Sequence, residues 1–222
     1  MSGASATSLR RRGLFLSFEG GEASGKSLQA QLLATALRES GGVVVLTHEP
    51  GGTPAGERIR EILLHAREIA LGAEAQALLF SAARAQLVRD VIRPTLDAGR
   101  VVVADRFFDS TLAYQGYALG ADEGELRAIT SFAVGDLRPD RTFLLDVPVE
   151  ISVARARARE QGRAWDRFEA REREFHERLR EGYLRLAAAE PGRFVVVRGD
   201  RDEATIARDV RRQVDALLAA PA

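Results

Sequence analysis

The sequence predicts a three-layer α/β/α protein in which helices cover both faces of a five-stranded parallel sheet. Short apolar segments rich in β-branched residues alternate with longer segments of helical periodicity, a pattern typical of parallel sheets with crossover helices. The chain has 222 residues, which suits one such domain. Apolar residues make up 45% of it and charged residues 29%, as in ordinary globular proteins.

Five segments are expected to form the strands. Leu14–Phe18 is apolar and ends in a glycine-rich turn, and Val43–Thr47 is mostly β-branched. Arg100–Ala104, Arg141–Asp146 and Phe194–Arg198 are equally short and mainly apolar. Strands that alternate with helices in this way are expected to run parallel.

Helices are expected between these strands. Thr53 is a candidate N-cap with Pro54 at the first helical position, and Pro94 is expected to kink or divide a long helix. The expected helices are Lys26–Ser40, Thr53–Leu64, Ala73–Ala98, Ser110–Gln115, Glu123–Val134, Val149–Arg159, Glu169–Ala189 and Glu203–Leu218.

The composition of the chain argues against nucleic-acid-binding, membrane-spanning and secreted proteins. The formal net charge is zero, so no general attraction to nucleic acid polymers or anionic membranes is expected. The longest apolar runs are too short to span a bilayer. The chain has no cysteine, which fits a reducing compartment, and we expect a cytoplasmic protein. Residues 1–13 lack an apolar signal segment and are expected to form a disordered tail before a single domain at 14–220.

A glycine-rich loop of the form Gly-x4-Gly-Lys-Ser follows the first expected strand and opens the first expected helix. Main-chain N–H groups of such a loop bind phosphate oxygens. Lys26, the only lysine in the chain, would bridge the β- and γ-phosphates of a nucleotide, and Ser27 would ligate Mg²⁺. The motif alone does not identify the nucleotide. The predicted ATP-binding residues are Gly20, Gly21, Glu22, Ala23, Ser24, Gly25, Lys26, Ser27 and Leu28.

A carboxylate is expected at the end of a strand beside this loop. Asp105 directly follows the apolar run Val101–Ala104 and could hold Mg²⁺ directly or through water. An aspartate at a strand end is common by itself, but the phosphate-binding loop upstream favours the functional interpretation. Together these features predict a P-loop NTPase fold.

Seven arginines lie between Arg155 and Arg173, interspersed with acidic residues, as is typical of a solvated helix face. Arg159 and Arg163 differ because they flank the helix break expected near Gly162. We therefore predict a short lid around residues 159–167. Its arginines would stabilise charge on the transferring phosphoryl group, and its closure would exclude water.

Further motifs make the sequence similar to bacterial thymidylate kinases. The resemblance extends from about Leu14 to Leu186 and weakens after Phe194. The segments at 49–53 and 110–116 are the most diagnostic. The motifs, in order, are Phe18-Glu19-Gly20 with the P-loop, Glu49-Pro50-Gly51-Gly52-Thr53, Phe80-x3-Arg84, Asp105-Arg106, Ser110-Thr111-x-Ala113-Tyr114-Gln115-Gly116 and Asp166-Arg167-Phe168-Glu169.

The resemblance implies roles at the acceptor nucleotide. Arg60 and Arg106 would hold the phosphate of dTMP, because a guanidinium fork matches phosphate oxygens. Phe80 would stack on the thymine ring, although in Leu78–Phe80 ordinary core packing would explain it as well. Arg84 lies one helical turn further on and could donate to a thymine carbonyl oxygen.

The remaining implied contacts concern the sugar and the base. Glu22 would accept a hydrogen bond from the deoxyribose 3′-hydroxyl, Tyr114 would fill the space of a ribose 2′-hydroxyl, and Gln115 would face the base. The same resemblance places Glu49, Pro50, Ser110 and Thr111 at the substrate.

The resemblance also implies a subtype and a homodimer. Some thymidylate kinases carry an arginine in the P-loop, at the positions that Ala23 and Ser24 occupy in this chain. The chain is therefore similar to the other type, in which the lid supplies the arginine. Ala23 replaces a common glycine and His48 a common arginine. The apolar face of Ala73–Leu96 could supply a dimer contact, but burial in its own core would account for it equally.

The implied reaction is transfer of the γ-phosphoryl group of ATP to dTMP with Mg²⁺, a step toward dTTP. A kinase of another nucleoside monophosphate (dUMP, UMP or CMP) is the nearest alternative. A nucleotide-driven switch or partner-binding ATPase is disfavoured. The chain has no Asn for an Asn-Lys-x-Asp guanine motif, and Arg106 stands where such ATPases commonly carry a glutamate.

Overall fold

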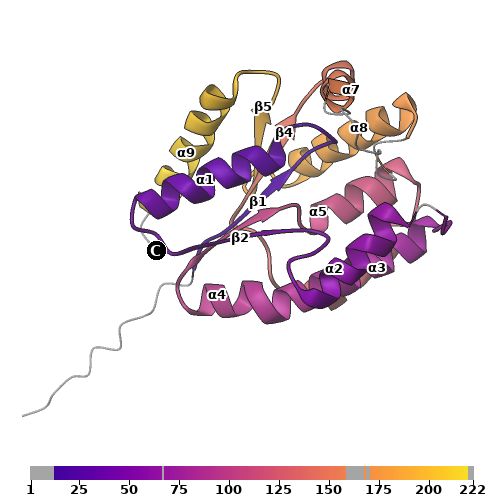
Figure 1. Ribbon diagram of the computed structural model, residues 1–222, viewed down its shortest axis with the longest axis horizontal. Helices are drawn as coiled ribbons and strands as arrows, with labels where there is room; N and C mark the ends of the chain where they lie inside the picture. Colours follow the sequence, from indigo (N-terminus) through magenta and orange to yellow (C-terminus); the bar gives the residue numbers. More distant parts are fainter. Residues whose placement is uncertain (1–12, 67, 159–167, 169–170, 220–222) are drawn as a thin grey trace, which may run out of the picture.

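A five-stranded, all-parallel sheet forms the centre of the protein, with strand order β2-β3-β1-β4-β5 (Figure 1). The computed structural model describes residues 13–66, 68–158, 168 and 171–219. The strands are β1 (Phe15–Glu19), β2 (Val44–His48), β3 (Val101–Asp105), β4 (Arg141–Asp146) and β5 (Phe194–Arg198). The predicted fold class is confirmed, and β4 and β5 have the predicted bounds.

Alternate strand residues serve two separate apolar cores. On β1, Phe15 belongs to one core and Leu16 to the other, as period-2 side-chain alternation requires. Helices α1 (Lys26–Glu39) and α9 (Glu203–Ala219) cover one face of the sheet, and the remaining helices gather mainly over the other (Figure 1). This arrangement gives the three predicted layers.

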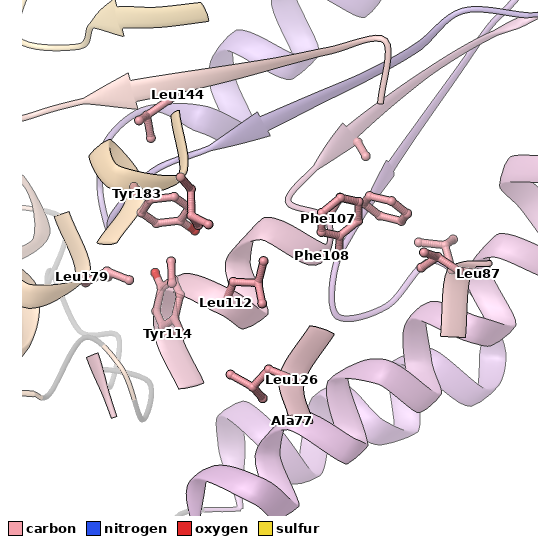
Figure 2. Close-up of a cluster of buried hydrophobic side chains, with 14 of the residues drawn as sticks. Ala77, Leu87, Phe107, Phe108, Leu112, Tyr114, Leu126, Leu144, Leu179 and Tyr183 are labelled. Carbon is pink, nitrogen blue, oxygen red and sulfur yellow. The ribbon is translucent and has the colours of Figure 1, made fainter. Parts of the chain in front are cut away.

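The core on the second face is the larger one and underlies the candidate site. Figure 2 shows part of it, with side chains from several helices converging below β4. The elements that contribute to it are η1 (Glu61–His65), α3 (Ala73–Leu87), η2 (Val88–Ile92), α4 (Arg93–Asp97), α5 (Phe108–Thr111), η3 (Leu112–Ala118), α6 (Glu123–Val134) and α8 (Arg173–Ala189).

Some helices differ from the prediction in their details. The expected helix 73–98 is interrupted at η2, a π-helical turn just before Pro94, which cannot donate a main-chain hydrogen bond. Helix α8 begins at Arg173 rather than Glu169, because Glu172 has an extended backbone (ψ 160°). The expected helix 110–115 begins earlier, at Phe108, and continues as η3 to Ala118.

The short helices α2 (Pro54–Arg60) and α7 (Val149–Ala158) complete the described elements. The Thr53 side chain accepts from the Gly56 N–H at 3.0 Å, as predicted for an N-cap. Gly13, placed in the tail by the sequence, donates its N–H to the Leu96 carbonyl at 2.9 Å, so the packed chain begins one residue earlier. The lid predicted at 159–167 lies outside the described residues.

Candidate functional site

The glycine-rich loop connects β1 to α1 in a conformation that needs glycine. Gly20 and Gly25 have φ of 139° and 96°, and a Cβ on Gly20 would lie 2.6 Å from the Leu145 carbonyl oxygen. Gly25 is the N-cap of α1, and no side chain caps this helix. The first N–H groups of a 14-residue helix are therefore left for an anion.

Lys26 is held over this loop. Its Nζ donates to the Gly21 carbonyl at 2.6 Å and to Ser24 Oγ at 3.3 Å, and the residue is 6% exposed. Burial, and then the charge of Arg106, lower the pKa of Lys26 to about 8, despite the opposing effect of Glu22. A phosphate beside this ammonium would offset both effects.

Asp105 and Ser27 are placed to hold a divalent cation. Asp105 ends β3 in register with Phe18 of β1. Its Oδ1 is buried and has no hydrogen-bond partner among the described residues. Ser27 lies in the first turn of α1 and lines the same cavity. No cluster of three or more His, Cys, Asp or Glu suited to a metal is found within the described ranges. Two such oxygen donors fit Mg²⁺, which usually retains waters and phosphate ligands.

Arg106 is the centre of a polar cluster beside the loop. It is one of two non-glycine residues with positive φ in the described chain, at 73°. Its Nη2 donates to Glu22 Oε1 at 2.9 Å and to the Tyr114 hydroxyl at 2.8 Å, and its guanidinium lies 4.9 Å from the centroid of the Tyr114 ring. Its Nη1 donates to the Gly20 carbonyl at 3.1 Å. The guanidinium is thereby fixed next to the phosphate loop.

Glu22 carries a charge in this cluster. Burial alone would raise its pKa, but Arg106 and Lys26 outweigh burial and lower the pKa of Glu22. Tyr114 also donates to the Glu22 carboxylate. Burial raises the pKa of the Tyr114 phenol well above its usual value, so Tyr114 acts as a neutral donor.

The acceptor side of the site is built by the loop after β2 and by α2. Arg60, at the end of α2, donates to the Pro50 carbonyl at 2.8 Å, and the Glu49–Pro50 peptide is cis. His48 lies 3.1 Å from Glu57 at the half-exposed rim. Arg60 is thus directed toward the loop that precedes its own helix.

Aromatic side chains form a wall of the cavity. Phe80 of α3 lies 6.2 Å from Phe168 between ring centroids, and Tyr114 meets Phe168 edge-on at 5.2 Å. Gln115 donates to Gln76 at 3.3 Å. A flat apolar group could lie against this wall.

Arg84 lies behind the cavity surface. It is 1% exposed, and its Nη2 is 2.7 Å from Glu49 Oε2. Arg84 Nη1 and Glu49 Oε1 are both buried with no hydrogen-bond partner in the described part of the chain. The pair therefore retains one donor nitrogen and one acceptor oxygen that no described protein group satisfies.

Most of the predicted residues surround one cavity of about 410 Å³ at the carboxyl ends of β1, β2 and β3. Gly20, Gly21 and Arg84 contact its lining residues but do not line it, and Arg159 and Arg163 lie outside the described residues. The predicted residues that line it are Glu22, Ala23, Ser24, Gly25, Lys26, Ser27, Leu28, Glu49, Pro50, Arg60, Phe80, Asp105, Arg106, Ser110, Thr111, Tyr114 and Gln115. Their chemical roles remain predictions.

Sequence reasoning assigned no role to three residues that also line the cavity, namely His48, Leu64 and Phe168. It also missed Glu19 and Tyr183, which bond to the same cluster as Arg106. A carboxylate at the end of an apolar strand was a usable signal for Glu19. Tyr183 carries no comparable local signal, since an aromatic residue on an amphipathic helix is usually core.

Comparisons with known proteins agree with this geometry. The family model described as "Thymidylate kinase" matches residues 18–210. The chain is 46% identical to a thymidylate kinase of Roseiflexus sp., covering 93% of this chain and 95% of that one. It is 49% identical to one of Geobacter sulfurreducens, with coverage of 87% and 92%. A crystal structure of thymidylate kinase from Ehrlichia chaffeensis is similar with a TM-score of 0.75 at 32% identity, over 92% of this chain and 99% of the other.

The match extends from the end of β1 into α9 and so includes the loop, the Asp105-Arg106 pair and the aromatic wall. Among the described helices, none has both the length and the apolarity to cross a membrane. By its sequence and by its fold, this chain belongs to the thymidylate kinase family.

Proposed function

We propose that this protein transfers the γ-phosphoryl group of ATP to the phosphate of dTMP. One observation carries the proposal: the P-loop lysine, a paired arginine and an aromatic wall line a single cavity. ATP would lie on the loop, and dTMP would enter from the side of α2 and α3. Both nucleotides would then meet at Arg106.

The donor side would hold the triphosphate through main-chain N–H groups and Lys26. Ser27 and Asp105 would hold Mg²⁺, whose chemistry is to neutralise charge on the phosphate oxygens. The unpartnered Oδ1 of Asp105 supports this assignment. Of the two predicted lid arginines, Arg159 and Arg163, either would add charge stabilisation at the transferring group.

The acceptor side would fix the dTMP phosphate with Arg60 and Arg106. This phosphate oxygen is already anionic at neutral pH, so the reaction needs no general base. Catalysis then consists of in-line positioning and neutralisation of charge by Lys26, Arg106 and the metal. Glu22 would accept from the sugar 3′-hydroxyl, while Tyr114 would leave no space for a 2′-hydroxyl.

Base recognition would rest on Phe80, Gln115 and the Glu49–Arg84 pair. Arg84 Nη1 has no hydrogen-bond partner among the described residues, and its donation to a thymine carbonyl oxygen would require the guanidinium to reach the cavity that it now lies behind.

Arg84→Ala is expected to raise the KM for dTMP far more than the KM for ATP. It should also lower the melting temperature, because the buried Glu49 loses its partner, a change that typically costs about 3–5 kcal/mol. Steady-state kinetics on folded protein, with both substrates varied in turn, measure the two KM values. Equal changes in the two KM values would contradict base recognition by Arg84.

A coupled assay of ADP release tests the reaction directly. Wild-type protein is supplied with ATP, Mg²⁺ and one monophosphate at a time: dTMP, dUMP, UMP or CMP. We expect the highest kcat/KM with dTMP. A preference for another monophosphate would support the alternative kinase, and slow ADP release independent of any monophosphate would support the ATPase class.

We also infer a cytoplasmic homodimer. The absence of cysteine fits a reducing compartment. Helices α3 and α6 pack together and carry exposed apolar residues, with Phe132 95% exposed and Leu78 55% exposed. Such a surface suits contact with a second copy of the chain.

A further inference from the structure

Glu19 is a fully buried carboxyl group that the proposed reaction does not use. It ends β1 directly before the P-loop and is 0% exposed. Its Oε1 accepts from the Phe107 N–H at 2.8 Å, and its Oε2 accepts from Ser110 Oγ at 2.7 Å and from the Tyr183 hydroxyl at 2.9 Å. One side chain thus ties the central strand to α5 and α8.

Both hydroxyl groups that bind Glu19 also contact Arg106. Arg106 Nη1 donates to Ser110 Oγ and to the Tyr183 hydroxyl, each at 3.2 Å. Tyr183 and Tyr114 lie on facing elements with their hydroxyl groups turned toward the same space (Figure 2). Arg106 donates to both hydroxyl groups. Within the described residues, the side-chain hydrogen bonds that connect Glu19 to Arg106 pass through the hydroxyl oxygens of Ser110 and Tyr183, which also lie 2.9 Å from each other.

The chemistry of these groups determines which of them donate and which accept hydrogen bonds. When Glu19 is ionised it only accepts hydrogen bonds, so the Ser110 and Tyr183 hydroxyl groups donate to it and leave their lone pairs to Arg106. An amide in place of the carboxylate would introduce an N–H donor, which would compete with Arg106 for those lone pairs.

Arg106 needs such support because its backbone is strained. A non-glycine residue at φ 73° is held there by its surroundings at some cost in free energy. Its N–H donates to the Phe18 carbonyl at 2.9 Å, one residue before Glu19. The end of β1 therefore holds the Arg106 main chain directly, through Phe18, and the Arg106 side chain indirectly, through Glu19 and the two hydroxyl groups.

We propose that Glu19 and Tyr183 are positioning residues that orient the Arg106 guanidinium toward the acceptor phosphate. This inference rests on the proposed role of Arg106 at that phosphate. Neither residue touches the substrate: Glu19 acts through the two hydroxyl groups, and Tyr183 is one of them.

Tyr183→Phe tests the inference with the least disturbance, because it removes one oxygen and keeps the ring. We expect kcat/KM for dTMP to fall about tenfold, the loss typical of one hydrogen bond to a charged group. The KM for ATP should change less than twofold. Tyr117→Phe is the matched control, since the Tyr117 ring lies under Arg185 and takes no part in the cluster. It should retain wild-type kinetics.

A double-mutant cycle separates positioning from a general structural role. Glu19→Gln and Tyr183→Phe act on the same connection to Arg106, so their effects on kcat/KM for dTMP should be strongly non-additive. Glu19→Gln combined with Tyr117→Phe should be additive. If Glu19→Gln fails to fold, the single Tyr183 variant still decides the question.

The possible failures are distinguishable. Wild-type protein that does not phosphorylate dTMP would remove the proposed function itself. Active wild-type protein together with a Tyr183→Phe variant of unchanged kcat/KM, or with additive effects of the first pair, would overturn the positioning role alone.

Discussion

Lys26 is an ammonium group whose protein environment disfavours its charge. It is nearly buried, and Arg106 adds repulsion that Glu22 and Asp105 only partly compensate. A residue held in this way contributes little to stability and gains its energetic advantage when phosphate is bound.

Lys26→Ala is therefore expected to lower kcat by at least about 10²–10³-fold, as removal of a preorganised charge-stabilising donor does elsewhere. The melting temperature without ligand should not fall, because an unfavourably buried charge is removed. Coupled ADP release and thermal melting measure both quantities. Wild-type turnover in this variant would refute the assignment of Lys26.

Glu19 links the site to the pH dependence of folding. Burial and the neighbouring Asp109 raise the pKa of Glu19 from 4.5 to about 7, although Arg106 opposes them and Ser110 donates to the carboxylate. Between these two values the native state keeps a proton that the unfolded state has released. The free energy of unfolding contributed by Glu19 therefore falls as the pH rises through this range.

Glu19→Gln removes this titration. We expect its stability relative to the wild type to increase between about pH 5 and about pH 8, by up to about 3 kcal/mol. Urea unfolding of both proteins at a series of pH values measures the difference between their free energies of unfolding. The contributions of the other titrating groups are the same in both proteins and cancel in this difference. A difference that does not change with pH would mean that the carboxyl group titrates normally in the native protein.

Individual residues were predicted from the sequence only where a motif or a strand end identified them. The P-loop, Asp105 and Arg106 belong to this class, and all border the cavity or its walls. Tyr183 could not be assigned, because its proximity to the site depends on how α8 packs against η3. Phe168 could not be assigned, because its contact with Tyr114 joins segments far apart in the sequence. The burial of Arg84 against Glu49 likewise depends on packing between α3 and the loop after β2.

At the scale of elements, periodicity and capping residues located the strands and helices closely. Helix α6 and strands β4 and β5 were predicted with the bounds that the structure gives. The π-helical turns were not predicted, because they are rare single-turn features that no characteristic residue marks in this sequence. The late start of α8 was missed because the polar residues before it fit a helix as well as a loop.

The N-cap at Thr53 connects an element to function. Thr53→Ala should cost about 1–2 kcal/mol and lower the melting temperature by a few degrees. It should also raise the KM for dTMP, because α2 ends at Arg60. Asp122→Ala removes a comparable cap, from α6, and should lower the melting temperature without changing this KM. Equal KM values for dTMP in the two variants would show that the N-cap of α2 does not affect acceptor binding.

At the scale of the whole molecule, the strand order determines where the site can form. Strand β1 lies between β3 and β4, so the P-loop and the Asp105-Arg106 turn leave the sheet side by side. Loops at the carboxyl ends of neighbouring parallel strands make the binding crevice in such sheets. The alternating pattern in the sequence predicts this class of fold, whereas the order of the strands follows from tertiary packing.

The proposed homodimer can be tested at its most exposed apolar residue. Phe132→Arg should produce a monomer in light scattering coupled to size exclusion, because it places a charge in the apolar contact. Leu218→Arg, on α9 at the other face of the sheet and 45% exposed, should leave the dimer intact. A dimer that persists in the Phe132 variant would exclude this part of α6 from the interface.

The solitary lysine has a practical consequence. In a chain whose other basic side chains are 31 arginines and three histidines, an acylating reagent directed at amines reacts with the α-amino group and with one side chain, and that side chain borders the cavity. Peptide mass spectrometry of the Lys26 adduct would give the fraction of protein molecules whose cavity is protected by a bound nucleotide. No engineered label is needed for this measurement.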